Sequence, residues 1–449
     1  MNSAFGGIRH TLTKLDFTFV KCDFPLIYLA DILMQCTRLE TFVFNAMDDL
    51  QLFLGDFDIL ETTHNALIDM DITTTSTTGE AIQPLLRQCP KLRRLLVKNC
   101  TSDVLDMVHD HCPNLEIFGY EAQSPDVPQL KEKLQQEEKQ NKCNNEPGLR
   151  EIYSRDGGYG VPAEGFMKLI RKNAKTLQVV FANFSMTEEQ ENNDEPHQDA
   201  LPSEYGEKFQ FERLEKLTYW PDMYDYVEPL LLHAIKSCPS LKTFNPAGST
   251  NIPKFIDTLV ARLPATVERL EIANVDSEDD DSGKDMVRLF KAYYDKMPIA
   301  DTKLRNVRFH YSNVITDDVL DVLSGFETLE ALQLLGLTKV STKGITNFLQ
   351  KIAEGPHITE LRLDDMYVVD DAILHLLSKM EYLESLHLED LSRITNEGLT
   401  YVVNNVKGLR KLKIKDCVRI CDNDELRTNV KNNTKIEELD IIFDFNDEE

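Results

Sequence analysis

Histidine and cysteine are the side chains of this sequence most able to bind a metal ion or act as nucleophiles. His109 and His111 flank Asp110 in a segment that we expect to be helical. Residues two apart do not share a helical face, so this pair does not indicate a metal site. Cys417 and Cys421 are four apart, but no second Cys or His pair accompanies them as in a zinc site. We therefore predict no metal and no other cofactor.

Motifs for enzymatic chemistry are also missing from the sequence. It contains no phosphate-binding loop, no dinucleotide-binding glycine motif, no serine-hydrolase elbow and no zinc-protease motif. The remaining histidines are scattered along the chain. We predict that the protein is not an enzyme.

Six of the nine cysteines instead recur at two fixed positions relative to a leucine pattern. Four lie three residues before the first leucine of an L-x-x-L-x-L segment, and two lie eight residues after one. The two groups are Cys36, Cys89, Cys112 and Cys238, and then Cys100 and Cys417. A small apolar thiol at a repeated position indicates packing in a core.

The leucine pattern itself recurs about sixteen times, with a basic step near 26 residues. Alternation at its fourth and sixth positions has the period of a strand, and a helix-like stretch follows each copy. N-caps are expected at Ser341, Asp370 and Thr395. Stacked units of this kind bury a common core, so we predict an α/β leucine-rich-repeat solenoid, a horseshoe with a parallel sheet on its concave face and helices on its convex face. Clear copies begin at Leu92, Leu304, Leu329, Ile358, Leu383, Leu409 and Ile436, and weaker ones at Leu12, Leu39, Leu67, Leu115, Leu149, Leu177, Leu214, Leu241 and Val267.

Several phrases resemble the signatures of the cysteine-containing leucine-rich-repeat family. They are CPKLRRLLVKNC, CPNLEIF, CPSLKTF and RITNEGL, the last from Arg393 to Leu399. Such repeats occur in F-box/LRR proteins and in proteins like the antagonist of the mitotic exit network. The resemblance, which spans Leu12 to Ile442, implies substrate recognition for an SCF-type (cullin–RING) ubiquitin ligase that leads to proteasomal degradation.

An F-box, the module through which such receptors bind the ligase adaptor and cullin, is not found in the sequence. The first repeat begins by Leu12, and LPSEY from Leu201 lies in an acidic insertion, so we do not accept it as an F-box. Binding of adaptor and cullin would need an F-box missing from this chain. The alternative is an F-box-independent adaptor or regulator in signalling or the cell cycle.

Composition bounds the partners and the location of the protein. The net charge of −27 disfavours binding to nucleic acid. No run approaches the ~18 apolar residues of a membrane span, and the N-terminus lacks a signal-peptide pattern, so we expect no membrane partner and a cytoplasmic or nuclear location. The predicted repeat domain covers 8–443, with acidic insertions near 123–148, 185–208 and 275–285 and an acidic tail at 444–449.

The second, fourth and sixth residues after each first leucine should point into the concavity. These positions hold equal numbers of basic and acidic residues, in contrast to the acidic chain as a whole. Two clusters among them are predicted to bind a protein substrate or partner. The first, aromatic and basic, consists of Tyr153, Arg155, Phe181, Lys216 and Trp220. The second is basic and consists of Arg308, His310, Arg362, His387, Lys411 and Lys413.

The second cluster suits an acidic or phosphorylated peptide. Two alternatives stay open. In the first alternative, the repeats around the first cluster are irregular and its rings point into the core. In the second, the second cluster is a solvated face whose salt bridges contribute little to stability.

Overall fold

The chain forms two compact units in the computed structural model, Met1–Ser240 and Leu241–Glu449. We describe each unit by itself. The structure describes residues 7–18, 26–45, 51–55, 63–75, 77–98, 101–120, 147–154, 161–185, 210–220, 238–246, 256–257, 259–260, 266–275, 282–296, 302–420, 428 and 436–442. The three predicted acidic insertions and the acidic tail lie largely or wholly outside these residues.

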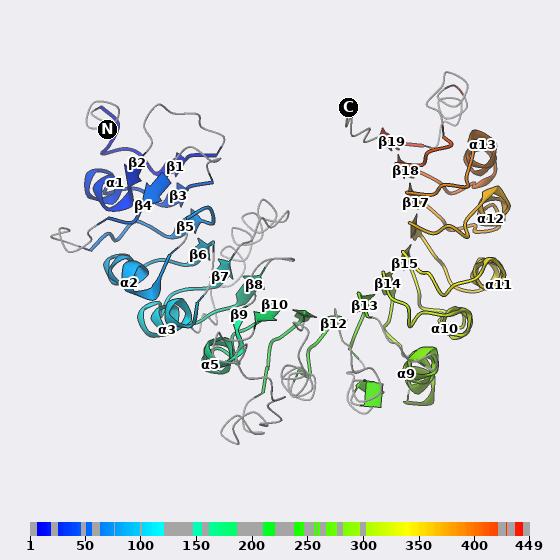
Figure 1. Ribbon diagram of the computed structural model, residues 1–449, viewed down its shortest axis with the longest axis horizontal. Helices are drawn as coiled ribbons and strands as arrows, with labels where there is room; N and C mark the ends of the chain where they lie inside the picture. The colour runs from blue at the N-terminus through cyan, green and yellow to red at the C-terminus, as the bar shows by residue number, and fades with distance from the viewer. Residues whose placement is uncertain are drawn as a thin grey trace, which may run out of the picture. The chain divides into compact units, whose positions relative to one another are not determined.

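The first unit is a parallel sheet with helices on one side (Figure 1). Each strand pairs in parallel with the next one of the sheet along the chain. The strands are β1 (Lys14–Asp16), β3 (Thr41–Val43), β5 (Asp69–Ile72), β6 (Arg94–Val97), β7 (Ile117–Tyr120), β8 (Glu151–Ser154), β10 (Val179–Ser185) and β11 (Lys216–Trp220). The helices described are α1 (Leu29–Gln35), α2 (Gly79–Gln88), α3 (Ser102–His111) and α5 (Ala163–Lys172).

Two short parallel pairings in this unit were not expected from the leucine pattern. Strand β2 (Leu26–Tyr28) pairs with β4 (Gln51–Phe53), and β9 (Val161–Pro162) pairs with the end of β10. Both lie outside the L-x-x-L-x-L segments, which is why the repeat did not indicate them.

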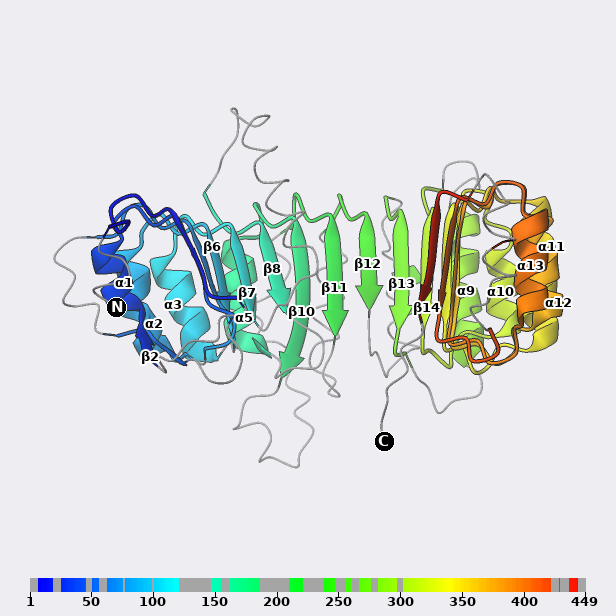
Figure 2. The ribbon, with the colours of Figure 1, turned by 90° about the horizontal axis from the view of Figure 1, so that it is seen from above.

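The second unit repeats the same strand and helix alternation more regularly (Figures 1 and 2). Its strands are β12 (Thr243–Pro246), β13 (Arg269–Ala273), β14 (Asn306–His310), β15 (Ala331–Leu335), β16 (Glu360–Asp364), β17 (Ser385–Glu389), β18 (Lys411–Lys415) and β19 (Glu438–Ile442), paired in that order and all parallel. The helices α9 (Ser282–Lys296), α10 (Asp317–Leu323), α11 (Thr342–Glu354), α12 (Asp371–Leu377) and α13 (Asn396–Asn405) lie on one side of these strands.

The leucine pattern predicted every strand of the repeats. In all sixteen copies a strand begins two residues after the first apolar residue, as β16 does after Ile358 and β8 does after the weak copy at Leu149. The fold is therefore an α/β leucine-rich-repeat solenoid, as predicted.

The core lies between sheet and helices, and the repeated leucines build it. Leu361 and Leu363 of one strand and Leu386 and Leu388 of the next are buried. The burial of each such side chain stabilises the folded state by about 1.5–3 kcal/mol. The predicted N-caps are confirmed. The side chains of Ser341, Asp370 and Thr395 each accept a hydrogen bond from a backbone N–H in the first turn of α11, α12 and α13 respectively.

The cysteines before the leucines end helices. Cys36, Cys89 and Cys112 are the C-caps of α1, α2 and α3, and each backbone N–H donates to the carbonyl four residues earlier. Each cysteine carbonyl then accepts the N–H of the first leucine of the repeat. The thiols of Cys36 and Cys89 are buried, whereas Cys112 is partly exposed. The thiol thus fills the corner where the helix turns into the strand.

A second repeated corner follows the strands of the second unit. The residue after each of β13 to β18 has a positive φ, with values from 44° to 59°. One of the six is glycine, and the others are Asn274, Tyr311, Asp365, Asp390 and Asp416. Asn and Asp tolerate this left-handed conformation better than most residues.

No helix in the described part of the chain is long and apolar enough to cross a membrane.

Candidate protein-binding surface

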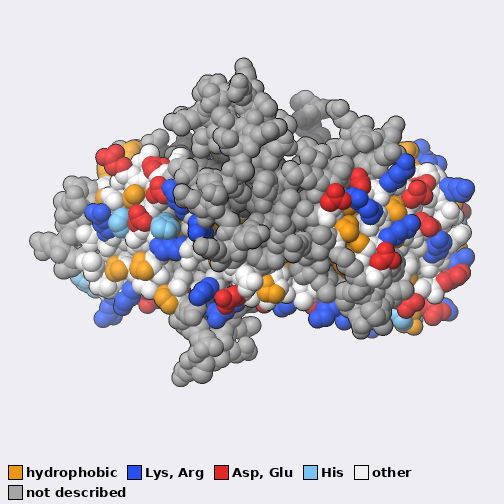
Figure 3. Space-filling model, turned by 90° about the horizontal axis from the view of Figure 1, so that it is seen from below, with side chains coloured by type: hydrophobic (Ala, Val, Ile, Leu, Met, Phe, Trp, Pro, Cys, Tyr) orange, Lys and Arg blue, Asp and Glu red, His pale blue; other side chains and the backbone are white. Residues whose placement is uncertain are grey.

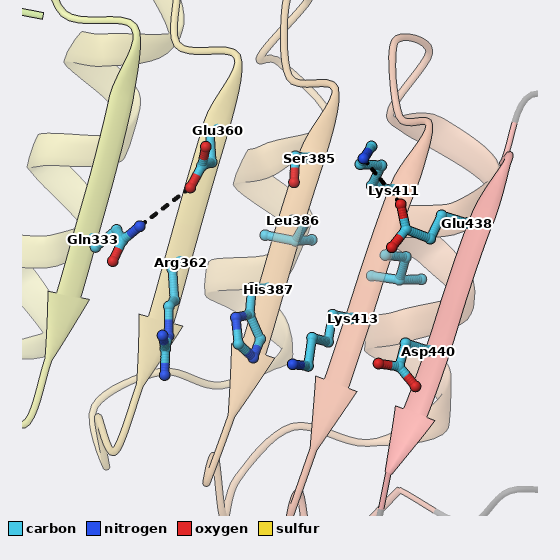
Figure 4. A pocket seen from close by; sticks show the side chains of 11 residues that line it. Gln333, Glu360, Arg362, Ser385, Leu386, His387, Lys411, Lys413, Glu438 and Asp440 are labelled. Atoms are coloured by element: carbon cyan, nitrogen blue, oxygen red, sulfur yellow. Dashed lines mark hydrogen bonds and ion pairs between the residues drawn. The ribbon is translucent and has the colours of Figure 1, made fainter. Parts of the chain in front are cut away.

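The strand face, by which we mean the side of the sheet away from the helices, carries the predicted partner-binding positions. In β14 the side chains of Val307 and Phe309 are buried, whereas those of Asn306, Arg308 and His310 are only partly buried. Figure 4 shows the corresponding side chains of β15 to β19 projecting on the side opposite the helices. The burial of side chains follows the predicted alternation in β14, β17 and β18 and in most of β16.

Five hydrogen-bond donors form a continuous line across the strand face. Arg308, Gln333, Arg362, His387 and Lys413 are register partners on consecutive strands β14 to β18, and we call them the central row. At one end of the row Arg308 is next to Glu271, and at the other end Lys413 is next to Asp440. The fold thus brings four residues of the predicted basic cluster into one row.

Arg362 is held by two carboxylates through a single nitrogen. Its Nη2 lies 2.6 Å from Asp364 Oδ2 and 2.7 Å from Glu389 Oε2. Glu389 also accepts a hydrogen bond from Lys415 Nζ at 3.0 Å. Burial raises the pKa of Asp364 above its ordinary value in spite of the bond from Arg362. At Glu389 burial also acts upward, but the bonds and charges of Lys415 and Arg362 lower the pKa.

Arg308 and Lys413 are much less engaged. The closest ion-pair contact of Arg308 within the described residues is Nη1 to Glu271 Oε2 at 3.9 Å, and the buried Arg308 Nε has no hydrogen-bond partner. Burial and neighbouring arginines lower the pKa of Arg308, although Glu271 opposes them. The part of the structure that is described gives Lys413 no ion pair within 4.0 Å. The terminal guanidinium nitrogens of Arg308 and the ammonium of Lys413 therefore have capacity for an external acceptor, whereas the buried Arg308 Nε has not.

Two histidines on the strand face are neutral at pH 7. Burial, and then the charge of Arg362, lower the pKa of His387 to about 4. Burial and the charge of Arg308 lower the pKa of His310 to about 4. His387 Nε2 lies 3.2 Å from Glu389 Oε2, yet the geometry is not that of a hydrogen bond. Each imidazole can therefore carry its single proton on either nitrogen.

A depression of about 180 Å³ opens over β15 to β19 (Figure 4). The short side chain of Ser385 lies between the longer ones of Glu360 and Lys411, its register partners. Lys411 is exposed and pairs with Glu438 at 2.9 Å, so it contributes less free charge than expected. The lining comprises Gln333, Glu360, Arg362, Ser385, Leu386, His387, Lys411, Leu412, Lys413, Glu438 and Asp440.

The predicted aromatic cluster lies in the first unit and is only partly described. Tyr153 and Phe181 are register partners on β8 and β10, and both are partly buried while Ile152 and Val180 beside them are buried. These two rings therefore lie on the strand face and are not turned into the core. Tyr153 donates its hydroxyl to Glu151 at 2.6 Å.

Of the remaining members of this cluster, the structure describes only the side chain of Lys216. Lys216 is partly buried on β11, where it is the register partner of Val179. Trp220 belongs to the same strand, but its side chain, like the whole of Arg155, lies outside the described residues.

The strand face differs in organisation from the outside of the second unit. In Figure 3, basic and acidic side chains are interspersed over the described surface of this unit. On the strand face, by contrast, the donors follow one row from strand to strand.

No protein-family model matches the chain, and no curated protein matches it. Two examples follow of the solved structures that are similar to it. The leucine-rich-repeat-containing protein LegL7 from Legionella pneumophila is 18% identical, with 52% of this chain and 75% of that chain covered and a TM-score of 0.37. The structure of the Rad7 and Elc1 complex in yeast contains a chain that is 14% identical, with 83% of this chain and 81% of that chain covered and a TM-score of 0.41. At these scores the likenesses say nothing about function.

Proposed function

We propose that this protein is a binding scaffold that captures another protein on its strand face. The observation that carries the proposal is the central row, a line of donors on the face that the helices leave uncovered, in which Arg362 Nη1 and Lys413 make no ion pair within the described residues. Donors that reach the surface without a partner in the protein can bond to a ligand that lies on that surface.

In its finer form, the captured protein is the substrate of an SCF-type ubiquitin ligase. The support is the cysteine-containing repeat signature, whose cysteines cap helices and pack in the core. A substrate receptor needs a binding face and no catalytic group of its own. The role fits a protein of the cytoplasm or nucleus.

The alternative is an F-box-independent adaptor that holds partners together without a ligase. It rests on the same strand face and the same repeats. Affinity purification of the protein as its own cells produce it, with any segment that precedes or follows this sequence, and quantitative mass spectrometry separate the two functions. A ligase adaptor and a cullin recovered in near-equal amounts with the chain support the receptor.

Stable protein partners without adaptor or cullin would support the alternative and reject the receptor. Failure to recover any stable partner, under conditions where a known receptor recovers its own, would contradict the scaffold itself.

A further inference from the structure

The spacing of the central row matches a short extended peptide. Adjacent strands are about 4.8 Å apart, so the five donors extend over about 19 Å. An extended peptide of about six residues has this length. Arg308 and Lys413, the two cations with the fewest bonds, occupy the ends of the row, and Arg362 lies between them.

Arg362 is fixed in position for an anion. Both of its ion pairs use Nη2, so its other terminal nitrogen makes no bond within the described residues. The carboxylates of Asp364 and Glu389 hold the planar guanidinium in one orientation, which reduces the entropy lost when a ligand binds. Figure 4 shows Arg362, His387 and Lys413 side by side along the lower part of the depression.

His387 separates the two cations and can donate a third hydrogen bond. Its Nε2 is buried beside Glu389 Oε2 at 3.2 Å. Its Nδ1 makes no hydrogen bond within the described residues and is the nitrogen left for a ligand, in the row between Arg362 and Lys413. A guanidinium, an imidazole and an ammonium around one open depression are the groups that proteins use to bind a phosphoryl or carboxylate group.

We infer that the depression over β15 to β19 binds an anionic side chain of a partner protein, with Arg362, His387 and Lys413 of β16 to β18 as its donors. The inference deepens the proposed function, on which it rests, by naming the chemistry of the captured segment. Phosphoserine and glutamate share this chemistry. Bound there, the anion offsets the charges of Arg362 and Lys413 that now lower the pKa of His387.

The surroundings favour an isolated anion over a long polyanion. Glu271 and Asp440 flank the two ends of the row, and Glu360 lines the upper part of the depression. These carboxylates, and the net charge of −27, repel a continuous phosphate backbone. The captured ligand is therefore a protein segment with a single anionic group at its centre.

The test uses the full chain and three libraries of short peptides. The libraries share random flanks and differ only at the central residue, which is phosphoserine, glutamate or serine. We expect the phosphoserine library, the glutamate library or both to be retained more strongly than the serine library. Preference for phosphoserine identifies a phosphoryl site, and equal retention of the two anionic libraries identifies a carboxylate site. Equal retention of all three overturns the inference.

Two variants with the same charge change make the test specific. Lys413→Glu should weaken retention of the anionic libraries by about tenfold or more, because it replaces a charge-assisted bond with repulsion. Lys343→Glu, on the exposed surface of α11, should leave retention unchanged. Since Lys413 makes no ion pair within the described residues, its replacement should leave the unfolding temperature unchanged, which circular dichroism verifies. Unaltered retention by folded Lys413→Glu would overturn the inference.

A second readout follows His387 directly. Addition of inorganic phosphate to the full chain should raise the pKa of His387 above about 4, as seen by its imidazole ¹H–¹³C resonance. A constant pKa at saturating phosphate would count against the site.

The inference and the proposed function can fail separately. If the chain captures a protein partner and Lys413→Glu captures it equally well, the scaffold stands and the anion site is rejected. If the libraries discriminate but adaptor and cullin do not co-purify, the anion site stands and the ligase role is rejected.

Discussion

Asp371 Oδ1 accepts a hydrogen bond from the backbone N–H of Thr395 at 2.8 Å, and its Oδ2 accepts one from the Thr395 hydroxyl at 2.7 Å. Asp371 begins α12 and Thr395 is the N-cap of α13, so one carboxylate joins neighbouring repeats. The same link joins Asp317 of α10 to Ser341, the N-cap of α11, at 2.8 Å and 2.5 Å. These bonds stabilise the stacking of helices that the leucines alone do not orient.

Asp371→Ala should lower the free energy of unfolding by about 1–3 kcal/mol, because it removes two charge-assisted bonds and leaves the N-cap unsupported. Urea denaturation followed by circular dichroism measures the change. Asp318→Ala, at an exposed carboxylate in the first turn of α10, is the control and should cost only a few tenths of a kcal/mol. Equal effects of the two substitutions would refute the stacking role of Asp371.

Gly398 leaves room for the same carboxylate. A Cβ at this position would lie 2.1 Å from Asp371 Oδ1, closer than any real contact. Gly398→Ala should therefore destabilise the protein by about 1–3 kcal/mol. In an Asp371→Ala background the same substitution should cost less, because the contacts with Oδ1 and Cγ are gone and only that with the Cβ of residue 371, at 2.9 Å, remains. Additive effects in this double-mutant cycle would show that the two residues do not interact.

His387 should make stability sensitive to mild acid. Its pKa of about 4 in the folded protein is below the ordinary value near 6.5, so the unfolded chain binds a proton first as pH falls. His387 therefore makes the free energy of unfolding fall progressively as the pH is lowered from about 6.5 to about 4. Arg362, Lys413 and Lys415 oppose its protonation, and Glu389 favours it.

His387→Gln is the variant that isolates this contribution. Its free energy of unfolding should fall less than that of the wild type between pH 7 and pH 4.5. Parallel pH dependences of the two proteins would show that His387 has an ordinary pKa.

The capping cysteines should be poor nucleophiles in the folded protein. Burial raises the pKa of Cys89 and of Cys112 to about 12, so almost no thiolate exists at pH 8. Alkylation by iodoacetamide, resolved by peptide mass spectrometry, should modify these two thiols only after unfolding in urea. Rapid modification of Cys89 in the native protein would contradict its place in the core.

The sequence predicted the strands well because each strand start is encoded locally. The spacing of Leu149 to Ile152 or of Ile358 to Leu361 is enough to place a strand, and sixteen repetitions make the assignment redundant. Strands β2 and β4 escaped prediction since they are short and lie outside the pattern.

The binding surface was predictable only in part. Strand alternation placed Arg308, Arg362 and Lys413 on one face in one row. It did not predict that Arg362 uses a single nitrogen for both carboxylates, or that Glu271 Oε2 lies as far as 3.9 Å from Arg308 Nη1. Those details depend on side-chain rotamers, which a repeat pattern does not specify.

Site-specific photocrosslinking in cells tests most directly whether the strand face is the binding surface. A benzoyl-phenylalanine replaces Ser385, in the depression, or Lys343, on the helix side, in otherwise identical full-length proteins. We predict crosslinked partner proteins from position 385 and none of the same proteins from position 343. Crosslinks to those partners from position 343 but not from position 385 would contradict the strand face as the binding surface.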